Sequence, residues 1–288
     1  MSAGYRPRMR ILVTNDDGID SLGLHELARA LRPLGDVTIV APDREFSGAG
    51  ASVGALHLAL PEVHDATVEG IDRSWSVSGP PALCVLFARL GAFGPPPDLV
   101  VSGINPGANV GRSVYHSGTI GAALTARIGG ITGIAVSQQA EYGIAGQAYE
   151  EVLDAQLWAS AAEVAATVVA SVIEHPPATP SVLNLNVPNL PVAEIKGYLW
   201  TDVAQTRQDP SARAVLEPKL GHKGSYHVNM KWGSQSEQSL DVDTGAVNNG
   251  YVSLCWLSRL DSTEGDPGPA SAALDRLLRR TAEPSPAH

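Results

Sequence analysis

The chain has 288 residues, of which 44% are hydrophobic and 17% charged, and its formal net charge is −10 at pH 7. This length can bury one large core, as a single domain or with a smaller appendage. The acidic charge argues against a nucleic-acid polymer or an anionic membrane as a partner, because both require a basic surface. A small anionic substrate stays compatible with this charge if a metal ion supplies positive charge locally.

The two cysteines, Cys84 and Cys255, lie within apolar segments and are predicted to be buried thiols of a reducing compartment. The apolar run near the N-terminus is too short for a signal peptide, and no apolar stretch is long enough to span a bilayer. We therefore expect a cytoplasmic protein, with residues 1–9 as a flexible tail.

The first predicted strand ends in two adjacent carboxylates. Residues 11–13 are apolar and strand-forming, and a polar turn that contains Asp16 and Asp17 follows them. In an α/β domain this turn lies at the carboxyl edge of the sheet, where ligands bind. Adjacent acids repel each other unless solvent or a cation compensates their charge. We therefore interpret the pair as a candidate site rather than as a surface turn.

The next segments predict a parallel sheet. Residues 24–34 carry apolar side chains at helical spacing and end at Gly35, the expected helix C-cap, and residues 37–41 form a second strand. A strand, a helix and a strand at this spacing form a βαβ crossover, whose two strands are parallel and end at the same edge. Ser47, in the loop 43–52, is therefore expected beside the acids.

Later segments extend this pattern. The predicted elements are short strands within 53–79, clearest at 75–77, a helix over 81–90, strands over 98–102, 133–137 and 182–187, and a long helix over 148–174. The helical pattern then disappears, which predicts an antiparallel extension. The predicted domains are an α/β catalytic core over 10–196, a β-rich extension over 197–250, a return strand over 251–261, and a linker, helix and tail over 262–288.

A candidate anion site follows the strand over 98–102. The loop 103–111 contains glycines, asparagines and a proline, so it offers special backbone angles and free amides. Ser117 then serves as the predicted N-cap of a helix. A helix start that follows a glycine-rich loop favours phosphate, because its unpaired N–H groups and its dipole both attract an anion.

The oxygen atoms of this edge suit a hard cation. Carboxylates favour Mg²⁺, Mn²⁺ or Ca²⁺, and the sequence has no His or Cys spacing of a zinc site. Ser47 and Asn105 follow two strands of the same edge and offer neutral oxygens. A turn serine, and an Asn that stabilises the turn before Pro106, are the alternative interpretations. We predict one divalent ion per subunit, Mg²⁺ or Mn²⁺, with Ca²⁺ as an option in crystals.

Several short motifs, each weak alone, occur in the order typical of one family. They are residues 15–18, 41–44 with Ser47 and Gly48, 102–111, 117–119, 183–188 and 243–253. In this order the chain resembles the SurE (survival protein E) family over residues 9–258. The resemblance implies a metal-dependent phosphatase of nucleoside monophosphates. It also implies a Rossmann-like three-layer α/β/α core, and an antiparallel extension and C-terminal helix exchanged between subunits of a homodimer or homotetramer.

The resemblance further implies a role for each motif residue. The implied metal ligands are Asp16, Asp17, Ser47 and Asn105, and the implied phosphate-binding residues are Asn109, Ser117, Gly118 and Thr119, to which we add Gly48. As the catalytic set we predict Asp16, Asn15, Asn105 and His116, with a histidine that only fills the place of another side chain as the alternative for His116. Family members usually have a tyrosine where this chain has His116. The segment 79–84 and the loop 20–23 also depart from the family's motifs.

The expected reaction is that of a 5′-nucleotidase, an acid-type phosphatase, with 3′ esters and short polyphosphate left open as substrates. A metal-polarised water would attack phosphorus in line, while the Ser117 helix start and loop amides stabilise the developing charge. A non-hydrolytic metal and nucleotide-binding protein on the same scaffold is the main alternative. An aspartyl-phosphate enzyme is disfavoured because it usually carries Asp-x-Asp. A dinucleotide oxidoreductase is disfavoured because acids replace the Gly-x-Gly-x-x-Gly loop.

Overall fold

The structure is a computed structural model that describes residues 8–56, 58, 60–140, 148–205, 213–231 and 238–258. The elements given below all belong to the compact unit Met1–Leu257. Residues 1–7 of the tail expected over 1–9, and the linker, helix and tail expected over 262–288, lie outside the described residues.

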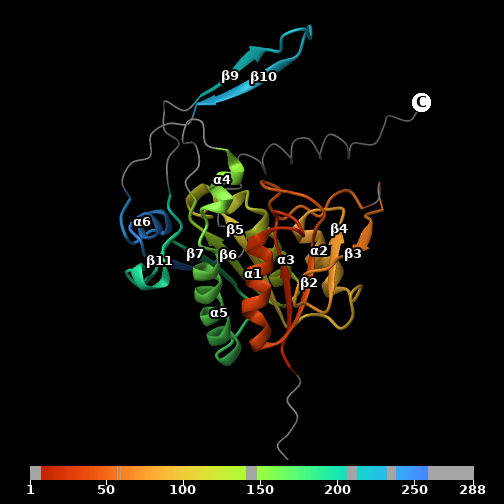
Figure 1. Ribbon diagram of the computed structural model, residues 1–288, viewed down its shortest axis with the longest axis vertical. Helices are drawn as coiled ribbons and strands as arrows, with labels where there is room; N and C mark the ends of the chain where they lie inside the picture. Colours follow the sequence, from red (N-terminus) through yellow and green to blue (C-terminus); the bar gives the residue numbers. More distant parts are fainter. Residues whose placement is uncertain are drawn as a thin grey trace, which may run out of the picture. The chain divides into compact units, whose positions relative to one another are not determined.

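A nine-stranded sheet forms the centre of this unit (Figure 1). Its strands are β1 (Arg10–Thr14), β2 (Asp36–Pro42), β3 (Val63–Asp65), β4 (Ser74–Val77), β5 (Leu99–Pro106), β6 (Thr132–Gln138), β7 (Val182–Val187), β8 (Tyr198–Trp200) and β11 (Val252–Leu257). Their order is β3-β4-β2-β1-β5-β6-β7-β11-β8. The six strands from β4 to β7 are parallel, while β3 and β11 pair antiparallel with β4 and β7. The mostly parallel sheet predicted from the sequence is thus confirmed.

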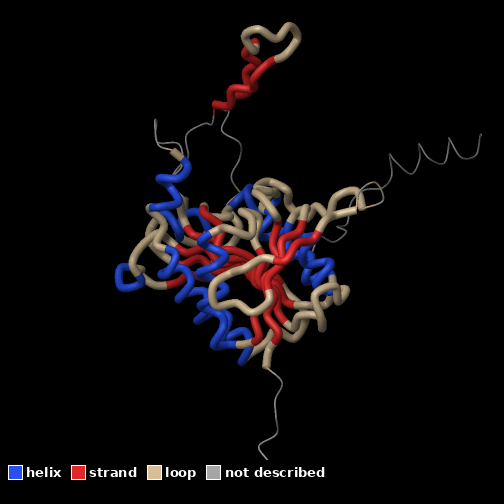
Figure 2. The backbone as a smooth tube through the Cα atoms, turned by 45° about the vertical axis from the view of Figure 1, so that its right-hand side comes forward, coloured by secondary structure: helices blue, strands red, loops and turns tan. Residues whose placement is uncertain are grey.

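Helices cover both faces of the sheet (Figure 2). The helices of these layers are α1 (Leu22–Leu31), α2 (Pro81–Arg89), α3 (Gly118–Ile128) and α5 (Trp158–Glu174). Ile11 and Val13 of β1 pack in one core cluster with α1 and α5, whereas Leu12 packs in a second cluster with α2 and α3. Because successive strand side chains point to opposite faces, the central strand serves both cores. None of the described helices is long and apolar enough to cross a membrane.

The helix after β1 ends earlier than the sequence predicts. A 3₁₀ turn, η1 (Arg32–Leu34), follows α1, because Pro33 has no N–H group with which to continue α-helical hydrogen bonding. Gly35 is the C-cap of η1, whereas Arg32 is the C-cap of α1, and Gly35 is extended, with φ −176°. A β-carbon at Gly35 would lie 2.2 Å from the carbonyl oxygen of Met9, so close packing against the chain explains this glycine.

The long helix predicted over 148–174 is two helices, which corrects that prediction. The first, α4 (Tyr149–Asp154), ends before α5 begins. Asn189 stabilises the break: its Oδ1 accepts a hydrogen bond from the Leu157 N–H at 2.9 Å, and its Nδ2 donates to the Ala155 carbonyl at 3.1 Å. Backbone groups that the helix break leaves unpaired are therefore satisfied by a side chain from a distant segment.

The region 197–250 is also more varied than predicted. β8 joins the main sheet beside β11, and a short helix, α6 (Asp243–Asn248), precedes β11, so the absence of helix was wrongly predicted there. The expected antiparallel pairing is present in a hairpin of β9 (Arg213–Pro218) and β10 (Tyr226–Lys231).

The hairpin is amphipathic. In an antiparallel pair, residues directly opposite each other share one face. One face therefore carries the apolar pairs Tyr226 with Pro218, Val228 with Leu216 and Met230 with Ala214, and the other carries His227 with Glu217 and Asn229 with Val215. All of these side chains are exposed.

Candidate active site

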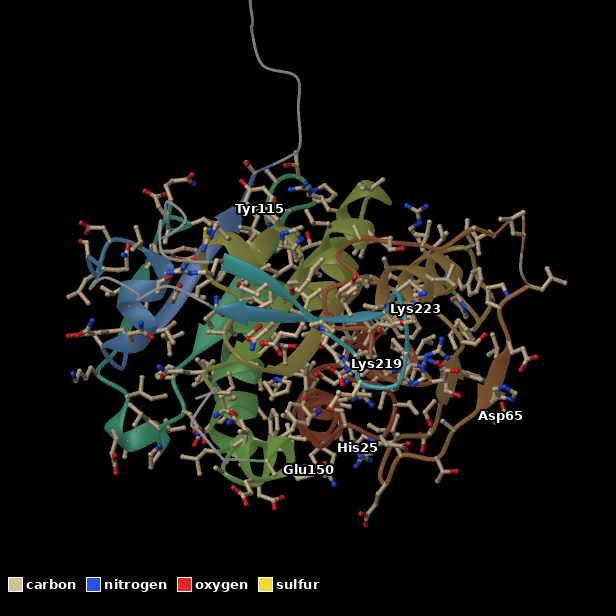
Figure 3. All side chains as sticks on the ribbon, turned by 90° about the horizontal axis from the view of Figure 1, so that it is seen from above. His25, Asp65, Tyr115, Glu150, Lys219 and Lys223 are labelled. Carbon is tan, nitrogen blue, oxygen red and sulfur yellow. The ribbon has the colours of Figure 1, made fainter. Side chains whose placement is uncertain are left out.

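An open cleft of about 400 Å³ lies at the carboxyl edge of the sheet, and the turns after β1, β2 and β5 contribute to it. The 3₁₀ turn η2 (Gly111–Tyr115) contributes Ser113 to the cleft, and α4 contributes Tyr149. In Figure 3 the labels of Tyr115 and Glu150 mark these two elements. The lining residues are Asp16, Asp17, Glu45, Ser47, Gly48, Asn105, Pro106, Gly107, Ala108, Asn109, Ser113, His116, Ser117 and Tyr149.

The cleft collects most of the residues that the sequence predicted for the site. Those that line it are Asp16, Asp17, Ser47, Gly48, Asn105, Asn109, His116 and Ser117. Three predicted residues, Asn15, Gly118 and Thr119, do not line the cleft but lie directly behind it.

Asp16 is held by the start of α3. Its exposed fraction is 3%, and the Thr119 hydroxyl donates a hydrogen bond to Asp16 Oδ1 at 2.6 Å. A β-carbon on Gly118 would lie 2.8 Å from the carboxylate of Asp16, so this approach requires glycine. Burial raises the pKa of Asp16, and the Thr119 hydroxyl opposes that rise. Gly118 and Thr119 therefore support an acid, whereas Ser117 is the residue of this helix start that lines the cleft.

Asp17 lies in a strongly negative environment. Burial raises the pKa of Asp17 well above its ordinary value, and the charges of Asp16 and Glu45 raise it further. Its Oδ2 atom is buried and has no hydrogen-bond partner among the described residues. Burial and then the same carboxylates raise the pKa of Tyr149 to about 12. No lysine or arginine is among the described residues that line the cleft. This uncompensated negative charge fits a hard divalent cation.

Neutral oxygens lie beside the two acids. The Asn105 amide nitrogen donates to the Gly107 carbonyl at 2.6 Å, so its Oδ1 is the side-chain atom suited to ligate a cation. The turn-stabilising role considered as the alternative is thus compatible with ligation. Ser47 is exposed in the loop after β2. Within the described part of the chain no group of three or more His, Cys, Asp or Glu could hold a metal, so a cation here depends on these neutral oxygens.

Asn109 is fixed by a buried polar network beneath the cleft. Its backbone N–H donates to Asn186 Oδ1 at 2.8 Å, and its carbonyl accepts from Asn184 Nδ2 at 2.9 Å. Its own Nδ2 donates to Ser137 Oγ at 2.9 Å. Asn184 and Asn186 lie two residues apart on β7, so they project from the same face of that strand. Strands β6 and β7 therefore position the loop that follows β5.

The other two residues of the predicted catalytic set differ in position. Asn15 is fully buried, and its Nδ2 donates to the Gly18 carbonyl at 2.9 Å, so it shapes the acidic turn from behind. His116 is exposed and lines the cleft.

Six lining residues are absent from the predicted set. Pro106, Gly107 and Ala108 belong to the loop 103–111, which was already expected at this edge, and the others are Glu45, Ser113 and Tyr149. Glu45 lies two residues before Ser47 in a loop already placed at this edge, so its position in that loop was an available signal. Tyr149 reaches the cleft from α4, far along the chain, and no local pattern predicts that placement.

Comparison with known proteins identifies the family. The family model described as survival protein SurE matches residues 11–210. The chain belongs to the SurE family. A relative from Carboxydothermus hydrogenoformans, named 5′-nucleotidase SurE, is 37% identical over 250 residues, which are 85% of this chain and 89% of the relative. A second protein of that name, from Aeromonas hydrophila, is 35% identical over 251 residues, or 87% of this chain and 92% of the relative.

A solved structure has the same architecture. The SurE protein from Aquifex aeolicus aligns with a TM-score of 0.70 and 32% sequence identity, covering 92% of this chain and 99% of that one. The family resemblance expected from the order of the motifs is thereby confirmed, and so is the α/β fold.

Proposed function

We propose that this SurE-family protein is a metal-dependent nucleotidase that hydrolyses nucleoside monophosphates to nucleoside and phosphate. The observation that carries the proposal is a cleft lined by Asp16, Asp17 and Glu45, with no lysine or arginine among its described lining residues. These carboxylates alone would repel a phosphate dianion, so a cation has to accompany the substrate. The names of the relatives, 5′-nucleotidase SurE, support the same reaction.

Asp16, Asp17, Ser47 and Asn105 would hold one divalent cation, Mg²⁺ or Mn²⁺, since carboxylate, hydroxyl and amide oxygens are hard ligands. Such an ion supplies positive charge to phosphate oxygens and acidifies bound water. Asp16, oriented by Thr119, would accept a hydrogen bond from the attacking water and aim it at phosphorus.

Ser117, Asn109 and Gly48 would bind the phosphate. Ser117 Oγ already accepts a hydrogen bond from the Ile120 N–H at 3.1 Å, so its own hydroxyl hydrogen can be donated to a phosphate oxygen. His116, which lines the cleft, would donate a proton to the leaving oxygen. Together these donors would stabilise the charge that develops on phosphate during the reaction.

Phosphate release from a panel of nucleoside 5′- and 3′-monophosphates and short polyphosphate, with Mg²⁺ or Mn²⁺, tests the proposal. We expect release from the monophosphates and its loss in Asp16→Asn. Asp20→Asn is the matched control, because Asp20 is an exposed acid of the same turn that does not line the cleft. Tight nucleotide binding by the wild-type protein without phosphate release would establish the non-hydrolytic alternative instead.

We also propose a homo-oligomer, either a dimer or a tetramer, in which the apolar face of the β9–β10 hairpin packs against a second copy of the chain. A two-stranded hairpin is marginal in water unless its apolar face is covered. Val228 and Leu216, which are opposite each other on that face, are 58% and 63% exposed. The two cysteines are free and buried, which supports our proposal of a reducing, cytoplasmic location.

A further inference from the structure

Asp243, the first residue of α6, is a fully buried acid that does not line the cleft. All hydrogen-bond partners of its carboxylate donate to it. Its Oδ1 accepts from the Ala204 N–H at 3.0 Å and from the Thr244 N–H at 2.7 Å, with the Thr244 hydroxyl at 3.3 Å. Its Oδ2 accepts from the Gly111 N–H at 2.9 Å. One carboxylate therefore joins the region before β11 to the loop that follows β5.

Gly111 stands at a critical point of that loop. It follows Asn109 by two residues and begins η2, which runs to the N-cap of α3. Its φ is +54°, in the left-handed region. The Ser117 N–H and the His116 N–H both donate to the Ser113 carbonyl at 3.0 Å, so η2 is continuous with the residues that line the cleft. A shift of Gly111 would displace all of them together.

Two anchors hold this segment from behind. The asparagines of β7 fix Asn109, as described above, and Asp243 fixes Gly111. A hydrogen bond to a buried carboxylate is stronger than one between neutral groups. The Gly111 N–H donates to this carboxylate, so removing the acceptor would leave a buried donor unpaired.

We infer that Asp243 is a positioning residue for the proposed reaction: it fixes the segment 107–117 in the geometry that binds phosphate, acting through the Gly111 amide. The inference rests on the proposed function for its kinetic part only. It gives a role to the first residue of the motif 243–253, which the proposed metal site and the acids of the cleft do not explain. It also makes the region before β11 a determinant of substrate affinity.

Asp243→Asn tests this selectively. The asparagine oxygen can still serve the two backbone donors of Ala204 and Thr244, which places its NH₂ group against the Gly111 N–H. Asp241→Asn is the matched control, because Asp241 is an exposed acid two residues away that lies outside the cleft. We expect KM for the nucleotide and the inhibition constant of inorganic phosphate to rise about tenfold or more in Asp243→Asn, with Mn²⁺ affinity unchanged and the control like wild type. Equal KM values in wild type and Asp243→Asn would overturn the inference.

Hydrogen–deuterium exchange separates this inference from the proposed function. In Asp243→Asn, deuterium uptake should increase in peptides that cover 107–117 and stay unchanged in peptides that cover β1 and α1. This readout needs no activity, so it stays valid if the wild-type protein releases no phosphate. A uniform increase over the whole chain would show a general structural role and would also overturn the inference. If Asp243→Asn does not fold, Asp243→Ser, which leaves space for water at the Gly111 N–H, is measured in the same way.

Discussion

The hydroxyl of Thr119 and the carboxylate of Asp16 are joined by a 2.6 Å hydrogen bond between α3 and the turn after β1. Both residues are buried, so the bond fixes the orientation of an acid that also lines the cleft. Thr119, which the family resemblance assigned to phosphate binding, thus orients the carboxylate of Asp16.

Replacing Thr119 by valine removes this hydrogen bond while keeping the shape of the side chain. Because a hydrogen bond to a charged group contributes about 1.5–3 kcal/mol, we expect kcat/KM for nucleoside monophosphates to fall by about 10- to 100-fold. Thr119→Ser keeps the hydroxyl and should retain most of the activity. Steady-state phosphate release measures both. Similar losses in the two variants would mean that the methyl group, and not the hydrogen bond, matters.

Asp17→Asn should stabilise the protein in EDTA. Burial and the neighbouring carboxylates disfavour a charge at this position, so its removal relieves a penalty that only a cation offsets. We expect the Tm in EDTA to rise by about 2–4 °C, equivalent to about 1 kcal/mol. The increase in Tm that Mn²⁺ gives the wild-type protein should be lost. Thermal unfolding with and without Mn²⁺ measures this, with Asp20→Asn as the control that keeps the Mn²⁺ effect.

His116→Gln should affect esters unequally. A nucleoside is a poor leaving group and needs its oxygen protonated, whereas an aryl phosphate does not. We expect kcat for a nucleoside 5′-monophosphate to fall by about 100-fold, and kcat for an aryl phosphate to change little. Tyr115→Phe is the control, because Tyr115 is 70% exposed and does not line the cleft. Equal losses for both substrates would exclude proton donation by His116.

A charged side chain on the apolar face of the hairpin tests the proposed homo-oligomer. Val228→Lys places an ammonium group on the face that we propose to be covered by a second copy, whereas Asn229→Lys places it on the opposite face. Burying an unpaired charge is costly, so the first variant should lower the molar mass measured by light scattering after size exclusion. The second should keep the mass of the wild type. A wild-type protein that elutes as a monomer would refute the oligomer.

The ion pair of Arg10 with Asp98 gives a pH-dependent contribution to stability. The hydrogen bond from Arg10 lowers the pKa of Asp98, and the Arg10 Nε and backbone N–H both lie 2.9 Å from Asp98 Oδ2. A lowered pKa stabilises the fold above the ordinary carboxyl pKa, and this contribution is lost as the pH falls through the folded value.

We therefore expect Asp98→Asn to lower the free energy of unfolding at pH 7 by about 0.5–1 kcal/mol, a small effect because both side chains are over a third exposed. Wild type and variant should converge as the pH falls below the ordinary carboxyl pKa, which denaturant titrations at pH 7 and at low pH can check. Asp36→Asn, in the looser pair with Arg8 at 3.5 Å, is the comparison and should change stability less.

Local sequence patterns predicted the helices and strands that depend on interactions between neighbouring residues. β1, the crossover through α1 to β2, and the Ser117 N-cap of α3 all follow from periodicity and capping chemistry, so the carboxyl edge could be located from sequence. The break between α4 and α5 could not, because Asn189 makes it from 32 residues away. The same limit applies to Gly118, whose contact with Asp16 arises only when α3 packs beside β1. Side-chain contacts between distant segments decide which residues of a motif reach the cleft and which support it.

The negative charge of the cleft implies that the metal ion binds before the nucleotide. Because Asp16, Asp17 and Glu45 line the cleft, a phosphate ester that arrives there without a cation is repelled by these carboxylates. Substrate saturation should therefore depend on how much metal is present, and by linkage the apparent affinity for the metal should rise as the substrate concentration rises. Initial-rate kinetics would then follow a compulsory sequence of addition, with the supply of free divalent ion deciding when the protein can engage a nucleotide at all.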